Sequence, residues 1–156
     1  MIVSMKGLQI AMTWATERLD ALACGSADSP EVVKTLKLGT LDEWGEGWIR
    51  KRWEPSPDLL NSDGSMFGGY IAALADQALA FAAMTVVPAD ALFRTLNLQV
   101  NFVRVGRAHP LLIEGRVSDA TKRLVTVSTD IRREDGKLVA EASGQQLIMP
   151  LSLQPQ

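Results

Sequence analysis

Cysteine and histidine are scarce in this chain of 156 residues, with one of each, Cys24 and His109. One cysteine excludes a disulfide within the chain, which fits a reducing compartment, and we expect a cytoplasmic protein. A zinc site of several Cys and His ligands cannot be built from one chain, so we expect no metal. A Ser-His or Cys-His catalytic system would have to use His109, which precedes Pro110 in a predicted turn. The sequence therefore disfavours both kinds of chemistry.

An excess of basic charge is also missing. Lys and Arg number 16 against 18 Asp and Glu, a net charge of −2, and they are mostly scattered. Nucleic-acid binding requires a basic face, so we expect no such partner. The apolar run near the N-terminus is short and is followed at once by Glu17 and Arg18, unlike a signal peptide.

The longest apolar stretch, residues 70–87, approaches the length of a membrane span. Asp76 and Gln77 lie in its middle, and a charge there favours a buried helix of a protein without membrane contact. Ala, Leu, Met and Phe form helices, and Pro88 supplies a stop. A helix apolar on nearly every side is expected to be buried on nearly every side. The Asp76 carboxylate then needs a partner or a use, because an isolated buried charge is costly.

Gly68 and Gly69 lie where a polar loop turns into this helix. The free N–H groups of a first helical turn, with the helix dipole behind them, attract an anion or a developing oxyanion. Gly68 and Asp76 are eight positions apart, which is about 12 Å along a helix axis. One small reacting group cannot touch both in the same chain. If both act on one carbonyl, the acid comes from a second copy, and we expect a two-fold dimer.

The length of the chain predicts one domain, and the pattern of apolar residues outside the central helix predicts a helix near the start and strands toward the end. Residues 8–22 have the apolar spacing of an amphipathic helix that stops at Gly25. Ser29 and Pro30 look like an N-cap and a first helical residue of a short turn. Residues 36–54 predict two strands around a glycine turn, and their three Trp residues belong either to the core or to a ligand pocket. Later alternation predicts four strands in a meander, at 96–102, 111–117, 125–131 and 138–149. A long antiparallel sheet with one apolar helix against it is an α+β fold.

The loop and helix NSDGSMFGGYIAALADQA resemble the signature of hotdog-fold acyl-CoA thioesterases of the phenylacetate-pathway (PaaI-like) and 4-hydroxybenzoyl-CoA thioesterase group. Seven residues fall at the matching spacings, and the later segments TLNLQVNFVR and LLIEGRV are also similar. The resemblance implies a hotdog fold, a sheet wrapped around one long helix, over residues 36–150, after an N-terminal helical extension in residues 1–35. The matching residues are Asn61, Gly64, Gly68, Gly69, Leu74, Ala75 and Asp76.

The resemblance also implies a reaction, hydrolysis of an acyl-CoA to a free acid and CoA with no cofactor. The Gly68 amide would polarise the thioester carbonyl, and Asp76 of a partner chain would attack it or activate a water. Asn61 would place the water or the thioester, and Thr95 would assist the acid. The protein would form at least a dimer, with a dimer of dimers typical of the family. Substrate-binding positions would be Met66, Phe67, Gly69 and Tyr70 at the acyl group and Arg104, Lys122 and Arg123 near the CoA phosphates.

One position departs from the family pattern. Phe67 stands where the family has a histidine before Gly68-Gly69. The backbone donor survives this change, but a side-chain hydrogen bond to the thioester does not. Two interpretations therefore stand together, a thioesterase with an adapted acyl pocket and a non-catalytic protein that binds or senses acyl-CoA.

Overall fold

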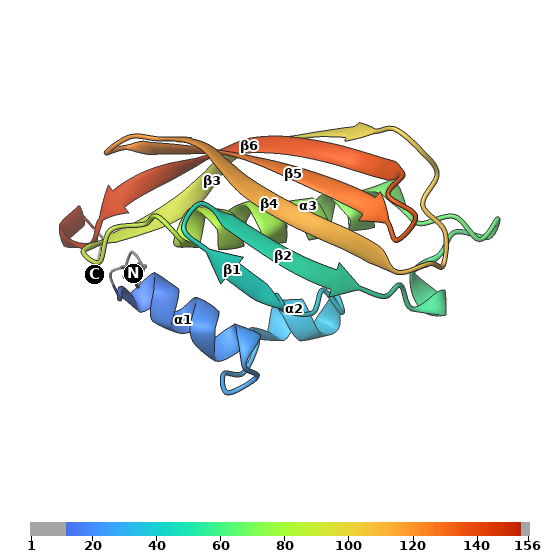
Figure 1. Cartoon of the computed structure of the whole chain (residues 1–156), viewed down its shortest axis with the longest axis horizontal. Coiled ribbons are helices and arrows are strands. Elements are labelled where there is room, and N and C mark those ends of the chain that lie inside the picture. Colours follow the sequence, from blue (N-terminus) through green and yellow to red (C-terminus); the bar gives the residue numbers. More distant parts are fainter. Residues whose placement is uncertain (1–11, 154–156) are drawn as a thin grey trace, which may run out of the picture.

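The computed structural model describes residues 12–153, and its centre is one antiparallel sheet curved around a long helix (Figure 1). The helix is α3 (Gly68–Met84). The strands are β1 (Glu43–Gly45), β2 (Trp48–Trp53), β3 (Ala91–Phe102), β4 (Leu111–Ala120), β5 (Leu124–Arg133) and β6 (Leu138–Pro150). Two short 3-10 turns cover Pro57–Leu59 and Leu151–Leu153. The α+β hotdog architecture predicted from the sequence is confirmed.

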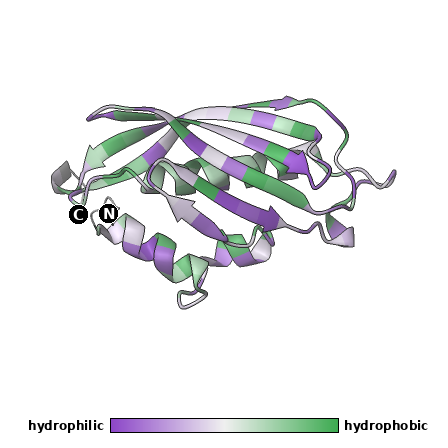
Figure 2. Cartoon of the chain, viewed as in Figure 1, coloured by the Kyte–Doolittle hydropathy of each residue, from purple (hydrophilic) through white to green (hydrophobic). Residues whose placement is uncertain are grey.

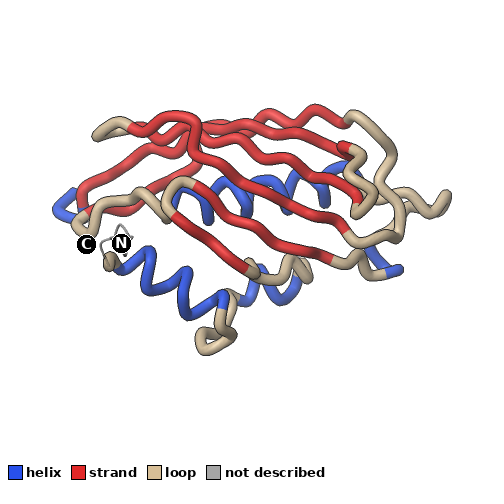
Figure 3. Tube along the Cα trace, in the orientation of Figure 1, coloured by secondary structure: helices blue, strands red, loops and turns tan. Residues whose placement is uncertain are grey.

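Two helices precede the sheet, α1 (Trp14–Ala23) and α2 (Glu31–Thr35), and Figure 3 shows them outside the sheet on the side of α3. Thr13 caps α1, because its hydroxyl accepts from the Thr16 amide, and Gly25 after the helix has φ of 72°. The predicted stop at Gly25 is confirmed, while the predicted residues 8–11 lie outside the described part. The short helix α2 follows Pro30 with no side-chain cap, so the expected Ser29 cap is wrong.

The strand order is β1-β2-β4-β5-β6-β3, which corrects the predicted four-strand meander. Only β4, β5 and β6 follow one another, whereas β3 pairs antiparallel with β6 at the far edge of the sheet. Alternation of apolar residues identifies a strand but not its neighbour, which explains the error. The predicted strand region 36–54 is also shorter in the structure, since β1 begins at Glu43.

The core lies between α3 and the concave face of the sheet. Figure 2 shows hydrophobic and hydrophilic residues alternating along the strands, as expected for a sheet with one covered face. Glycine permits close contact at Gly115, where an added Cβ would lie 2.8 Å from the Ala78 carbonyl oxygen of α3. Leu74 and Leu79 on α3 are fully buried.

The sequence predicted that α3 is buried on nearly every side, but in the single chain one side of the helix is partly exposed. A stripe of small residues and one acid stays at least partly exposed in the single chain: Gly69, Ala72, Ala73, Asp76 and Ala80. Strand β3 beside it is exposed on both faces over Arg94–Gln99, although its alternation predicted a half-buried strand. Both differences have one reason: a pattern of apolar residues in the sequence does not show what, if anything, buries them.

The loop between α2 and β1 is held by three side chains. Trp53 Nε1 donates to the Lys37 carbonyl oxygen at 2.9 Å, Lys51 Nζ to that of Leu38 at 2.6 Å, and Gln77 Nε2 to that of Gly39 at 2.8 Å. Lys37 and Gly39 both have positive φ, 50° and 69°. These hydrogen bonds fasten the loop to β2 and α3, so they fix where the two N-terminal helices join the sheet.

Candidate functional site

The start of α3 borders a hollow of about 340 Å³. Its walls come from the loop before the helix, the first turns of α3, and the segment that follows β3. It is lined by Ser65, Met66, Gly68, Ile71, Phe102, Val103, Arg104, Val105 and Gly106. This hollow brings the predicted residues Met66, Gly68 and Arg104 together in one chain.

The first two amides of α3, of Gly68 and Gly69, make no hydrogen bond in the described part of the chain, and Gly68 lines the hollow. Phe67 precedes the helix, and its carbonyl oxygen accepts from the amides of Tyr70 and Ile71. Neither the Gly68 nor the Gly69 amide donates such a bond to any acceptor within residues 12–153. A side chain at Gly68 would crowd Phe102, since an added Cβ would lie 3.3 Å from its ring. The site therefore offers two backbone donors at the positive end of a 17-residue helix.

Asp76 lies two turns further along α3 on the partly exposed stripe. Its carboxylate accepts a hydrogen bond from Thr95 Oγ1 of β3 at 3.3 Å, and the same hydroxyl lies 3.1 Å from Gln146 Oε1 of β6. Gln146 is fully buried, so the hydroxyl is held between a fixed amide and the acid. One oxygen of the carboxylate is thereby held by a side chain of the sheet.

Gly68 and Asp76 do not meet within one chain. Both belong to the same straight helix, and eight residues separate them by about 12 Å along its axis. The helix thus presents free N–H donors at its N-terminus and a carboxylate at a separate place two turns further along.

The other predicted residues of the loop have varied positions. Asn61 is exposed, and its side-chain amide donates to Ser65 Oγ at 3.0 Å. Ser65 also donates to Asp63, and this hydrogen bond lowers the pKa of the Asp63 carboxyl. Phe67 is 60% exposed, with its ring against Gly69. Asn61 therefore braces the loop and does not line the hollow.

Tyr70, a predicted acyl contact, is not among the residues that line the hollow at α3. Its ring packs on Trp53 with centroids 5.4 Å apart, and the residue is 8% exposed. Its hydroxyl is buried without a partner in the described part of the chain, and burial raises the pKa of Tyr70. Tyr70 thus lies in the core under β2, on the other flank of α3 from the hollow.

The three predicted CoA-binding cations lie at opposite ends of the sheet. Arg104 donates to the Leu138 carbonyl oxygen, where β6 begins. Lys122 and Arg123 occupy the β4–β5 turn, and the Arg123 carbonyl oxygen accepts from Ile148 near the end of β6. Ten residues of β6 separate these two places, about 30 Å. One chain does not gather these cations around one phosphate group.

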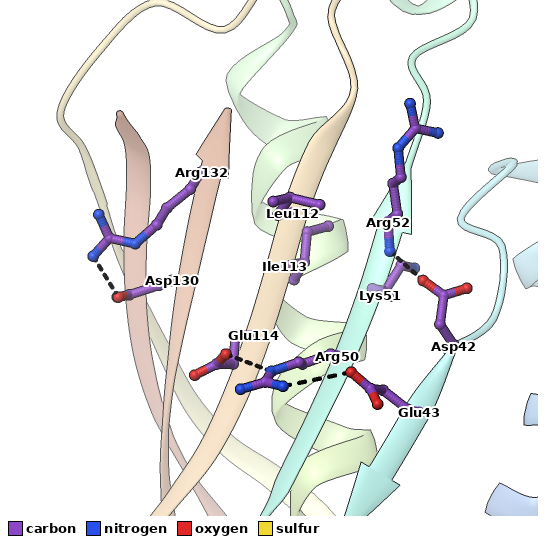
Figure 4. A pocket seen from close by; sticks show the side chains of 10 residues that line it. All are labelled: Asp42, Glu43, Arg50, Lys51, Arg52, Leu112, Ile113, Glu114, Asp130 and Arg132. Carbon is purple, nitrogen blue, oxygen red and sulfur yellow. Dashed lines mark hydrogen bonds and ion pairs between the residues drawn. The ribbon is translucent and has the colours of Figure 1, made fainter. Parts of the chain in front are cut away.

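A second hollow of about 330 Å³ lies on the outer face of the sheet over β2 and β4 (Figure 4). Arg50 forms ion pairs with Glu43 and Glu114, and Arg132 forms one with Asp130. The charged side chains that line this second hollow therefore neutralise one another. Lys51 borders this hollow, but its ammonium group donates inward to Gln77 Oε1 at 2.6 Å. The described residues contain no group of three His, Cys, Asp or Glu side chains placed to hold a metal ion.

Sequence reasoning missed the apolar wall of the hollow at α3. Phe102, Val103 and Val105 line it and are all largely exposed. A signal was present, because an apolar run that continues past an alternating strand into a loop indicates a surface that something else covers. Helices long and apolar enough to cross a membrane are not found between residues 12 and 153.

A sequence model of the thioesterase superfamily matches residues 63–140, half of the chain, from the loop before α3 to the start of β6. The chain belongs to this superfamily. The matched region contains Gly68, Asp76 and Thr95, and membership identifies the protein as a thioester hydrolase. No curated protein matches the chain significantly.

Solved structures of the superfamily have the same fold. A phenylacetic acid degradation-related protein of Ralstonia eutropha is 25% identical, covers 83% of this chain and 98% of its own, and superposes with a TM-score of 0.74. A thioesterase of Haemophilus influenzae is 20% identical over 87% of this chain and 92% of its own, with a TM-score of 0.75. A Streptococcus mutans protein bound to acetyl-CoA is 22% identical over 70% and 87%, with a TM-score of 0.65. The last two likenesses establish the fold.

Proposed function

We propose that the protein hydrolyses an acyl-CoA to a free acid and CoA at a site shared between two chains. The observation that carries the proposal is the exposed stripe of α3, which has unpaired Gly68 and Gly69 amides at its start and the Thr95-bound Asp76 two turns on. Oxyanion donors and a carboxylate are the groups that thioester hydrolysis needs. The acetyl-CoA bound to the Streptococcus mutans relative supports the choice of CoA thioesters.

The Gly68 N–H is placed to donate to the thioester carbonyl oxygen and to stabilise the negative charge that forms on it. Asp76 of the partner chain either takes a proton from the attacking water or attacks the carbonyl carbon itself, and water then releases the acid. On both routes the C–S bond breaks and the CoA thiolate takes up a proton. Thr95 keeps the acid oriented, and Asn61 helps to place water or thioester through its loop.

A two-fold pairing along β3 supplies the second chain. Strand β3 is an edge strand of twelve residues, and Leu98 and Phe102 on its concave face are 36% and 56% exposed. An open edge with apolar side chains is a template for another strand. Antiparallel pairing brings the Gly68 end of one chain to the Asp76 region of the other, and likewise Arg104 toward the turn of Lys122 and Arg123. The cations that one chain separates then face one CoA.

Thiol release from a panel of short, medium, long and aromatic acyl-CoAs tests the proposal. We expect turnover by the wild type and a loss of at least about 100-fold in kcat for Asp76→Asn, because a general base contributes about 10²–10⁴-fold. Asp90→Asn, an exposed acid after α3, is the matched control and keeps full activity. Equal rates for Asp76→Asn and wild type would refute the assignment of the acid.

Phe67 favours a second function, acyl-CoA binding without hydrolysis. Phe67 stands at the position where the family pattern has a histidine, and its ring lies against Gly69. This alternative predicts ligand binding by calorimetry and no thiol release from any acyl-CoA. Turnover gained by Phe67→His would then identify the missing group.

A further inference from the structure

The acid of the proposed site is connected to the interior of the sheet through two polar side chains. We propose that Gln146 of β6 is a positioning residue for Asp76, because its side-chain amide donates to Thr95 Oγ1 and so directs the hydroxyl proton of Thr95 to the acid. The inference rests on the proposed hydrolysis at Asp76 and adds the residue that sets the direction of its hydrogen bond. Gln146 acts through Thr95, which lies between the amide and the carboxylate.

Gln146 occupies a position of β6 where an apolar residue is expected. The buried residues alternate along this part of the strand, and the other members of the row are Ala142, Gly144 and Ile148. Gln146 is fully buried, and its neighbour on β5 is Val125, which is 1% exposed. A buried amide is costly unless it forms hydrogen bonds. Thr95, directly opposite on β3, is the partner that the fold supplies.

A β-bulge aims Thr95 at this amide. The pairing of β3 with β6 shifts by one residue between Thr95 and Asn97, so Thr95 lies opposite the buried Gln146. Asn97, two positions further, lies opposite Gln145 and donates to its side chain on the other face of the sheet. Gly144 makes room for the bulge, since an added Cβ there would lie 2.6 Å from the Asn97 carbonyl oxygen. Bulges re-aim side chains, and this one turns the Thr95 hydroxyl toward α3.

The hydroxyl of Thr95 has one proton and two oxygen neighbours. Its Oγ1 lies 3.3 Å from Asp76 Oδ1 and 3.1 Å from Gln146 Oε1, and a carboxylate and an amide oxygen are both acceptors. One of the two contacts then has no proton between its oxygen atoms. Meanwhile Gln146 Nε2 is buried and has no acceptor among residues 12–153. With the amide in this orientation, two acceptors share one proton while a donor stays unused.

A half-turn about the Cγ–Cδ bond of Gln146 removes this conflict without moving another side chain. It exchanges Oε1 and Nε2, so the amide N–H donates to Thr95 Oγ1 and the hydroxyl donates to Asp76 Oδ1. The amide oxygen then takes the place without a partner, and protein interiors tolerate an unpaired carbonyl more often than an unpaired N–H. A hydroxyl that accepts one hydrogen bond is also a stronger donor in the next. The acid is therefore held by a hydroxyl whose direction is fixed.

Removal of the amide gives opposite results for its two orientations. Gln146→Met removes the donor and keeps the length of the side chain. We expect kcat for the best acyl-CoA of the panel to fall by about 3–10-fold with KM unchanged, as for the loss of one hydrogen bond. If Oε1 instead accepted from Thr95, the same variant would free the hydroxyl for the acid. An unchanged or raised kcat in Gln146→Met would therefore overturn the proposal.

Thr129→Val is the matched control for the loss of a buried polar atom. Thr129 on β5 is 1% exposed, and its hydroxyl has no partner in the described part of the chain. It lies outside the contacts that join Gln146, Thr95 and Asp76. We expect Thr129→Val to keep the wild-type kcat.

A double-mutant cycle separates a positioning role from a general effect on packing. Thr95→Val alone should lower kcat by about ten-fold, since a hydrogen bond to a charged group is worth more than a neutral one. Gln146→Met added to Thr95→Val should cause no further loss, because the amide acts through the hydroxyl. Losses that multiply in the double variant would assign Gln146 a structural role and refute the inference.

A carboxyl signal tests the same hydrogen bonds without turnover. In protein labelled with ¹³C at the aspartate carboxyl carbon, the Asp76 signal is identified by its loss in Asp76→Asn. We expect this signal to move in Gln146→Met and in Thr95→Val, and to stay in place in Thr129→Val. A signal that Gln146→Met leaves unmoved would refute the positioning role, whether or not the protein hydrolyses a thioester. A signal that moves, in a protein without thiol release, would refute hydrolysis alone.

Discussion

Lys51 provides the sharpest test of the packing, because a charged side chain lies there in the core. It is 3% exposed and donates to the Leu38 carbonyl oxygen and to Gln77 Oε1. Neither partner carries a charge, so the ammonium group is not compensated by contact. Burial lowers the pKa of Lys51 to about 7, and the nearby Asp42 opposes this shift only in part.

The lowered pKa has a defined effect on stability. Between about pH 7 and pH 10.5 the unfolded chain holds the Lys51 proton and the folded chain releases it, so the free energy of unfolding rises with pH in this window. Below pH 7 both states are protonated and the cost of burial is constant. Integrated from pH 7 to pH 9, a lysine with these two pKa values adds about 2 kcal/mol to the free energy of unfolding.

Lys51→Met removes the titration and keeps most of the side-chain volume. The relief of charge burial, about 4 kcal/mol at pH 7, is offset by two acceptors left without a donor, at about 1–3 kcal/mol each. The prediction therefore concerns the slope: urea unfolding at pH 7, 8 and 9 should show the wild type gaining about 2 kcal/mol relative to the variant. Protein concentration must be held fixed, because assembly adds to apparent stability.

Lys137→Met, at a side chain 61% exposed, is the control and should keep the wild-type slope. Parallel pH profiles for wild type and Lys51→Met would refute the reasoning, since they would mean that Lys51 stays protonated in the fold or is not buried in solution.

Two further predictions concern the sheet. Gly115→Ala should lower the free energy of unfolding, measured in urea, by about 1–3 kcal/mol, because the added Cβ meets the α3 backbone. Gly136→Ala is the comparison, since its Cβ meets no atom and the change acts only through the φ of 83°. An equal loss of stability in both variants would contradict the close contact at Gly115. If the proposed dimer forms through β3, light scattering should show Leu98→Asp as a monomer and Gln99→Asp, on the opposite face of β3, as a dimer. A wild-type protein that is monomeric would refute the shared site.

The positions of the helices and strands could be predicted from the sequence, but their neighbours in the fold could not. The limits of α3 followed from its glycine start and the proline after its end, which are local signals. The neighbour of β3 did not, because pairing with β6 depends on contacts across nearly fifty residues of chain. The position of Tyr70 was partly accessible from the sequence: it lies six residues before Asp76, which places its side chain about 120° around the helix from the acid.

Lys51 was also within reach of the sequence. Ile49, Lys51 and Trp53 alternate with Arg50 and Arg52, so a strand there places Lys51 on the face of two apolar residues. Its partner Gln77 is a polar residue in an apolar helix, but nothing in the sequence links two residues 26 positions apart. Such pairs become visible only when the sheet has wrapped the helix.

The opposed ends of one chain make the strongest case for a shared site. Gly68 and Asp76 lie about 12 Å apart on one helix, and Arg104 and Arg123 lie about 30 Å apart along the sheet. Neither separation can be closed by side-chain movement, since packing fixes both elements. The two-fold pairing proposed at β3 reverses both directions, and in such a dimer both distances would be reduced together. Replacing Arg104 and Arg123 by Gln leaves β3 intact. We therefore expect this variant to bind CoA more weakly by calorimetry while its mass by light scattering stays that of the wild type.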